Sequence, residues 1–126
     1  MEKIYTNQQL HEFGLQLLTQ HLEAKGFTIE FVQPLKEALP HVFAKHGKTM
    51  TIIACAVDMY PNKGKLEDGD KAALKDVAKQ LNGKAAVASF GLVNAAGINE
   101  NNKELMSKPL ADAKFLADFS GLEYLD

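Results

Sequence analysis

The apolar residues of this chain concentrate in two stretches near its middle, and a helical pattern lies between them. Residues 49–57 (TMTIIACAV) and 84–93 (KAAVASFGLV) are predominantly apolar, which is typical of strands covered on both faces of a sheet. Residues 68–82 predict a helix with an apolar stripe at the spacing i, i+3, i+4 and i+7, formed by Leu74, Val77, Ala78 and Leu81. A helix between two such strands is a right-handed crossover, so we expect the two strands to be parallel.

The chain before these strands predicts one long helix. Thr6 or Asn7 serves as its N-cap, and Gly26 ends it after about Lys25. Gly14 lies near the middle of its apolar face, where glycine costs about 1 kcal/mol of helix stability relative to alanine. We therefore expect the helix to approach the sheet closely at Gly14. The apolar face itself comprises Leu10, Phe13, Leu17, Leu18 and Leu22.

Two short strands precede residue 49. Residues 27–33 alternate, with Phe27, Ile29 and Phe31 on one side, which indicates a half-buried strand. Residues 41–45 predict a second strand, and His46-Gly47 a tight turn into the next. These strands and residues 49–57 therefore form an antiparallel meander.

The C-terminal part predicts a polar loop from residue 95, a strand over residues 114–119, and a turn of helix in the tail GLEYLD. The element order is then α-β-β-β-α-β-β. This is an α/β chain of the α+β kind with a mixed sheet, and we expect residues 1–126 to form a single domain.

Composition narrows the classes of function. The formal net charge of −2 offers no basic field for a phosphate backbone, so nucleic-acid binding has no support from charge. Cys55 is the one cysteine, which excludes an intramolecular disulfide and, with no secretory signal, favours the cytoplasm. No apolar run reaches the eighteen or so residues that span a bilayer, so no membrane partner is expected.

The order of elements resembles the core of the restriction-endonuclease-like, PD-(D/E)XK, nuclease superfamily, in which a meander is followed by a crossover helix and a further strand. The resemblance implies an acidic residue early in the second strand and Glu/Asp-x-Lys in the third. The carboxylates bind magnesium, and the lysine helps to activate or position the attacking water. The corresponding positions here are Pro40-His41 and Ala54-Cys55-Ala56, which provide no carboxylate. Glu12, the counterpart of a family glutamate on the first helix, points towards water. The chain thus resembles a nuclease core with a degenerate active site.

Three short pieces, LEAKGF, VDMYPN and GLVNA, are similar to small proteins of the Bacteroides group, some of which are labelled as the F subunit of the sodium-pumping NADH:quinone reductase. That label implies an iron–sulfur cluster and a flavin. One cysteine cannot ligate a [2Fe–2S] cluster, and no dinucleotide fingerprint is present, so no cofactor is expected.

The best local cluster of polar residues follows the strand at 49–57. Asp58 ends this strand, at a place where open α/β sheets carry functional groups, and Tyr60 and Lys63 follow it. Aspartate at a strand end also commonly forms a turn. The acids Glu67, Asp68 and Asp70 are candidate metal ligands, although acids at the start of a helix favour capping by Asp68 or Asp70.

The four histidines lack the short helical spacing of a zinc site, so they predict packing or surface roles and no metal centre: His11, His21, His41 and His46.

We expect no catalytic residue, and three hypotheses of function remain. The first is a non-catalytic α/β module that contacts a ligand, an unknown protein partner or a second copy as a homodimer. The second is a nuclease with a migrated site, using Asp58 with Glu67 or Asp70. The third is a nucleic-acid binder without cleavage.

Overall fold

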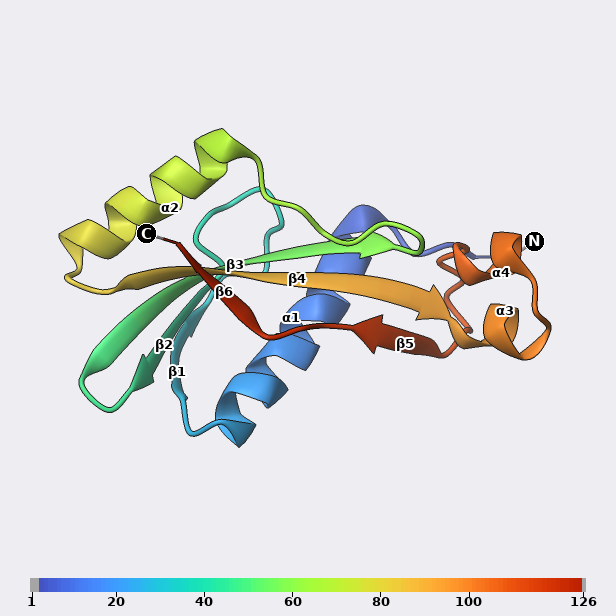
Figure 1. Ribbon diagram of the computed structural model, residues 1–126, viewed down its shortest axis with the longest axis horizontal. Coiled ribbons are helices and arrows are strands. Elements are labelled where there is room, and N and C mark those ends of the chain that lie inside the picture. The colour runs from blue at the N-terminus through green and yellow to red at the C-terminus, as the bar shows by residue number, and fades with distance from the viewer. Residues whose placement is uncertain (1–2, 126) are drawn as a thin grey trace.

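The computed structural model describes residues 3–125, in which one mixed sheet lies between two long helices (Figure 1). The strand order is β1-β2-β3-β4-β5, and β6 also pairs with β4; β3 and β4 are parallel and all other pairs antiparallel. The chain therefore has the α+β class with a mixed sheet that its sequence predicts. The strands are β1 (Thr28–Val32), β2 (Val42–His46), β3 (Thr49–Met59), β4 (Lys84–Asn94), β5 (Phe115–Asp118) and β6 (Leu122–Leu125).

Helix α1 (Asn7–Ala24) covers one face of the sheet. Thr6 caps it through a capping box with Gln9, and Gly26 follows its end with φ of 89°. At Gly14 the helix lies so close to the sheet that a Cβ atom would clash with the side chain of Val57. The predicted close approach is thus confirmed. Glu12 is exposed, as its position on the helix predicts.

The meander β1–β2–β3 is present, with one correction in β1. The register between β1 and β2 shifts between Ile29 and Phe31. This bulge moves Phe31 away from the α1 face, and its ring lies 5.4 Å from that of Phe43. Phe31 is 46% exposed, so the prediction that Phe27, Ile29 and Phe31 share one side is wrong.

The crossover from β3 to β4 runs through helix α2 (Asp68–Gln80) on the other face of the sheet. Leu74 and Ala78 are buried against the sheet, but Leu81 follows the helix as its C-cap and is 48% exposed. The predicted stripe therefore ends one turn early. Asn82, with φ of 55°, reverses the chain before Gly83, as predicted.

The C-terminal part differs most from prediction. The expected polar loop contains two short helices, α3 (Ala95–Asn99) and α4 (Lys103–Met106), which begin at the side-chain caps Asn94 and Asn102. The predicted final strand is β5. The tail forms β6 along β4 instead of a helical turn, apart from Asp126, which lies outside the described residues.

Candidate functional site

A polar cleft of about 540 Å³ lies at the carboxyl end of β3. The edge formed by the carboxyl ends of parallel strands is where open sheets commonly bind ligands. We name this feature the β3 cleft. It is lined by Asn7, Lys36, Glu37, Leu39, His41, Ala56, Val57, Asp58, Lys63, Gly64, Lys65, Leu66, Glu67 and Asp70.

Strand β3 forms one side of the cleft with small side chains. Ala56 lines it at the position where the nuclease resemblance implies the lysine of the acid-x-lysine motif. The connection from β3 to α2 passes directly over this strand, because a Cβ atom on Gly64 would clash with the carbonyl of Ala56. The N–H of Gly64 donates to the carbonyl of Phe90. Glycine at this position thus lets the connection close the cleft against the sheet.

The connection from β1 to β2 forms another wall and is tied down from two sides. The side chain of Gln8 on α1 donates to the carbonyl of Pro34 (2.6 Å) and accepts from the N–H of Lys36 (2.9 Å). His41 accepts from the N–H of Cys55 through Nδ1 (2.8 Å), so its proton lies on Nε2 and is donated to the carbonyl of Lys36 (3.0 Å). Neutral His41 therefore joins the central strand to the cleft wall.

Behind His41 lies a second buried histidine, His11 of α1. Its ring centroid is 4.3 Å from that of His41, at an interplanar angle of 61°. Both ring nitrogens of His11 are buried and have no hydrogen-bond partner among the described residues. Burial, followed by the proximity of His41 and Lys36, lowers the pKa of His11 to about 4. Burial also lowers the pKa of His41. Both rings are therefore neutral near pH 7.

The sequence predicts packing or surface roles for His11 and His41, but it does not predict their contact. The burial of His11 was predictable from the sequence, because His11 shares one helical face with Leu15, Leu18 and Leu22, which are all buried.

Three candidate carboxylates line the cleft, from Asp58, Glu67 and Asp70, and all three residues are exposed. Asp58 accepts from the N–H of Met59 through Oδ1 (2.8 Å), as in a turn former. Within residues 3–125, no group of three or more His, Cys, Asp or Glu side chains is arranged to hold a metal ion.

The predicted cap of α2 is wrong. Glu67 is the N-cap residue and makes no side-chain capping bond, while Asp68 and Asp70 lie in the first turn. There their negative charges interact favourably with the positive end of the helix dipole.

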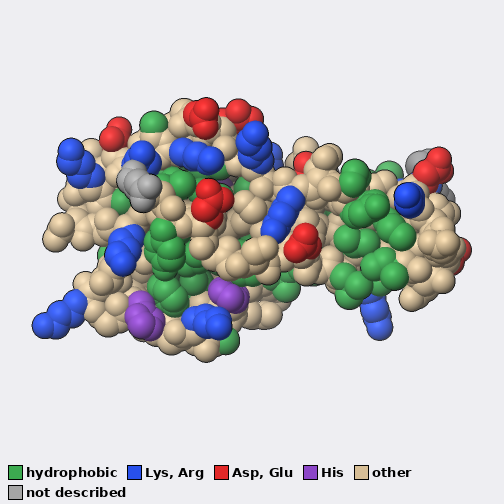
Figure 2. Space-filling model, in the orientation of Figure 1, with side chains coloured by type: hydrophobic (Ala, Val, Ile, Leu, Met, Phe, Trp, Pro, Cys, Tyr) green, Lys and Arg blue, Asp and Glu red, His purple; other side chains and the backbone are tan. Residues whose placement is uncertain are grey.

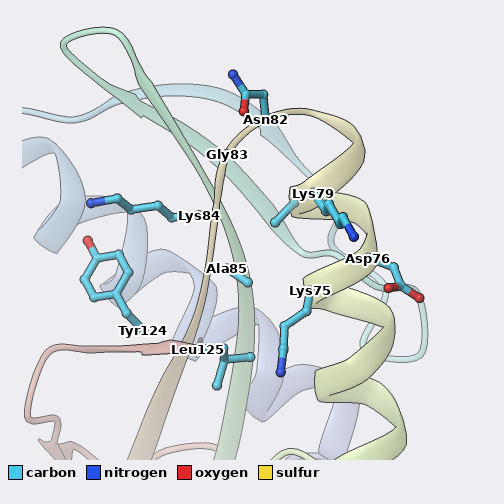
Figure 3. A pocket seen from close by; sticks show the side chains of 10 residues that line it. Lys75, Asp76, Lys79, Asn82, Gly83, Lys84, Ala85, Tyr124 and Leu125 are labelled. Atoms are coloured by element: carbon cyan, nitrogen blue, oxygen red, sulfur yellow. The ribbon is translucent and has the colours of Figure 1, made fainter.

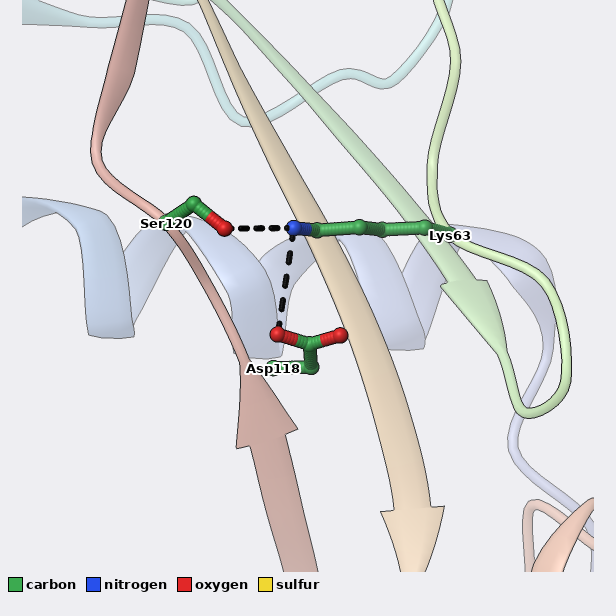
Figure 4. Close-up of polar contacts among 3 residues, drawn as sticks. All are labelled: Lys63, Asp118 and Ser120. Carbon is green, nitrogen blue, oxygen red and sulfur yellow. Dashed lines mark hydrogen bonds and ion pairs between the residues drawn. The ribbon is translucent and has the colours of Figure 1, made fainter.

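Lys63 and Tyr60 do not join these carboxylates. The Lys63 side chain extends across β4 towards β5, where Nζ donates to Oγ of Ser120 (3.0 Å) and lies 3.8 Å from Oδ1 of Asp118 (Figure 4). Gly91 leaves room for it, with the Cγ atom of Lys63 3.5 Å from the place of a Cβ. Tyr60 is half-buried, donates its N–H to the carbonyl of Leu92, and is not among the lining residues.

Cys55 is buried behind the cleft on the α1 side of the sheet. Burial raises the pKa of its thiol to about 12, so it remains protonated and poorly reactive. It therefore packs as a small apolar side chain, as predicted.

A second cavity, of about 710 Å³, lies between the C-terminal half of α2 and β6. Lys75, Asp76 and Lys79 extend from α2 on one side, while Lys84 and Tyr124 point away from that helix (Figure 3). This cavity lies beside the start of β4 and contains none of the predicted site residues. The β3 cleft is therefore the better candidate.

The fold and the cleft define the class of protein as an α+β domain with a mixed sheet and a polar cleft beside its central strand. The chain belongs to a family described as a domain of unknown function, DUF8840, whose model matches residues 8–125. No curated protein and no solved structure matches it. In residues 3–125, no helix is both long and apolar enough to cross a bilayer.

Proposed function

We propose that the chain is a non-catalytic interaction module, acting in the cytoplasm, that binds a polar ligand or a polar segment of a protein partner in the β3 cleft. The proposal includes self-association as a homodimer. The observation that carries it is the cleft itself, whose Ala56 lining offers space without a reactive group. Its β1–β2 wall is held in place by Gln8 and His41, which lowers the entropy cost of binding.

The proposed scaffold is a restriction-endonuclease-like core whose nuclease site is degenerate. The antiparallel meander, the crossover helix α2 and the parallel strand β4 support this relation. Alanine at position 54 supports the loss of the site, because a hard divalent cation requires oxygen ligands, and alanine at position 56 replaces the motif lysine.

One alternative is a nuclease with a migrated site. It is favoured by the presence of Asp58, Glu67 and Asp70 around one cleft, although these three carboxylates are not grouped as a metal site. A nucleic-acid binder without cleavage has less support. The cleft residues include four acids, Glu37, Asp58, Glu67 and Asp70, against three lysines, Lys36, Lys63 and Lys65, and Lys63 is already engaged.

The test is a cleavage assay on supercoiled plasmid with Mg²⁺ or Mn²⁺, paired with a titration of either ion followed by NMR. We expect no cleavage and no saturable shift of the Asp58, Glu67 and Asp70 signals. Cleavage that disappears in Asp58→Ala would replace the proposal with the nuclease alternative. A gel-shift series at low salt separates the third hypothesis, since binding to phosphates weakens steeply as salt rises.

Binding itself is tested with a library of small charged compounds, using amide signals of the cleft as the readout. Ala56→Leu fills the cleft and should abolish saturable shifts, whereas Ala73→Leu, on the exposed surface of α2, should leave them unchanged. Equal binding by both variants would exclude the β3 cleft as the site.

A further inference from the structure

Within residues 3–125, the outer edge of β5 has no partner strand, because β5 pairs with β4 on one side and with no strand on the other. An open edge presents backbone N–H and C=O groups that can pair with another chain. Apolar side chains gather at the end of the molecule where β5, α3 and α4 lie (Figures 1 and 2). This edge is therefore both unpaired and apolar.

The side chains of β5 divide between its two faces. Phe115 faces inward, with its ring 6.0 Å from those of both Tyr5 and Phe13. Leu116 points the other way and is 54% exposed. Strand alternation places Lys114 and Asp118 on the face of Leu116, and both are exposed. Along the exposed face of this edge a positive, an apolar and a negative side chain thus follow one another. The negative side chain, Asp118, is 73% exposed and also lies 3.8 Å from Nζ of Lys63.

We propose that this edge binds a second copy of the chain, with the two β5 strands antiparallel about a two-fold axis at Leu116. In this register Leu116 lies opposite Leu116 of the second copy. Lys114 of each copy lies opposite Asp118 of the other, so the two-fold axis creates two opposite-charge pairs. The sequence KFLAD is therefore complementary to itself in antiparallel orientation.

The backbone permits this register. The carbonyl of Lys114 accepts from the N–H of Ala95, and the ladder pairs Leu116 with Val93 and Asp118 with Gly91. Since residues of an antiparallel strand direct their backbone groups alternately to its two sides, those of Phe115 and Ala117 point outward. A two-fold axis at Leu116 brings Phe115 opposite Ala117 of the second copy. The outward-pointing N–H and C=O groups of one copy then face those of the other. Shifting by one pair in either direction brings Lys114 or Asp118 opposite Leu116 instead.

The opposite edge of the sheet is less suited to such pairing. The bulge in β1 interrupts its regular pattern, and antiparallel self-pairing centred on Glu30 would bring two like charges together. An exposed apolar residue also follows β1, since Leu35, in the connection from β1 to β2, is 59% exposed. Leu35 therefore provides a matched control for Leu116.

The first experiment measures the dimer dissociation constant by sedimentation equilibrium across a concentration series. Lys114→Glu should weaken the dimer about tenfold, because both charge pairs become repulsive. The double variant Lys114→Glu with Asp118→Lys should restore part of the affinity, since the pairs between copies are then exchanged while Lys63 loses its ion-pair partner Asp118. Leu116→Arg should abolish it and Leu35→Arg should not. Circular dichroism checks that each variant is folded.

The second experiment tests the register. Residues directly opposite in a non-hydrogen-bonded pair have Cα atoms about 4.5 Å apart, within the range of a disulfide. Leu116→Cys should therefore form a covalent dimer under mild oxidation, and Leu35→Cys should not. A protein that remains monomeric at every concentration overturns the inference, as does a dimer unaffected by Leu116→Arg and Lys114→Glu. The inference rests on the self-association within the proposed function and not on the cleft, so the two sets of experiments can fail separately.

Discussion

At the scale of single residues, the pair His11–His41 distinguishes this chain from an ordinary packed sheet. His41 satisfies both ring nitrogens, whereas both ring nitrogens of His11 are buried without a partner. A buried polar atom without a hydrogen bond costs about 1–3 kcal/mol. The fold therefore retains a destabilising residue directly behind its candidate cleft.

We predict that acid destabilises the protein through His11. Its folded pKa of about 4 lies below the ordinary value of 6.5, so the unfolded chain binds more protons between these limits. The free energy of unfolding should then fall by about 3 kcal/mol as the pH drops from 6.5 to 4. His11→Phe should remove this part of the dependence of the free energy of unfolding on pH. It should also raise the free energy of unfolding at pH 5, as measured with urea.

His21→Phe is the matched control, because His21 lies on the same helix and packs on Phe119 at 4.9 Å between ring centroids. Measured in parallel, this variant separates a general effect of replacing a histidine of α1 by phenylalanine from the effect of removing His11. If His11→Phe lowered stability at every pH, His11 would have a favourable partner, such as a bound water.

Only some residues of the candidate site could be predicted from the sequence. Asp58, Glu67 and Asp70 were recognisable because strand ends and helix starts mark the edges of a sheet, and these three do line one cleft. Lys63 was grouped with Asp58 by proximity in sequence, but its long side chain reaches Ser120. The β1–β2 wall was not anticipated, since its hydrogen bonds to Gln8 and His41 depend on tertiary packing.

At the scale of elements, prediction succeeded where a pattern is long. Helix α1 and strands β3 and β4 carry uniform patterns over 18, 11 and 11 residues. The C-terminal elements are 4 or 5 residues long. Alternation predicts the strand β5, but α3, α4 and β6 are too short for periodicity to distinguish them. Strand β6 is a strand because Ala85–Ala88 of β4 provide a partner, which the tail sequence alone does not reveal.

Helix α2 yields a prediction at this scale. Its N-cap Glu67 makes no capping hydrogen bond, although serine at such a position commonly does. Glu67→Ser should therefore stabilise the protein by about 1 kcal/mol in thermal or urea unfolding. Asp70→Ser, in the first turn of the same helix, should instead destabilise it slightly by removing a favourable charge from the helix dipole.

A loss of stability in Glu67→Ser would show that the glutamate makes a stabilising contact of its own. A gain in stability, combined with weaker ligand binding in the β3 cleft, would indicate that Glu67 is retained for binding rather than for folding.

At the scale of the whole molecule, composition and element order were enough to predict the α+β class, because two doubly buried strands and a crossover require a covered mixed sheet. The position of the cleft follows from the same arrangement. Which edge of the sheet is regular enough to pair with another strand does not follow from it, since the bulge in β1 and the course of β5 arise only in the folded chain.

The proposed dimer predicts that stability depends on protein concentration. The midpoint of thermal unfolding should rise with concentration for the unaltered protein, because association stabilises the folded state by mass action. Leu116→Arg should have a midpoint independent of concentration. Equal dependence in both proteins would place the contact elsewhere.

The bulge in β1 has a consequence for the size of any assembly. A sheet with two receptive edges can add copies without end and grow into a fibre. Here one edge is irregular and carries Glu30, so a two-fold contact at β5 occupies the other edge of the sheet that residues 3–125 form. Growth should stop at two, and the protein should remain free of filaments even at concentrations that saturate the dimer.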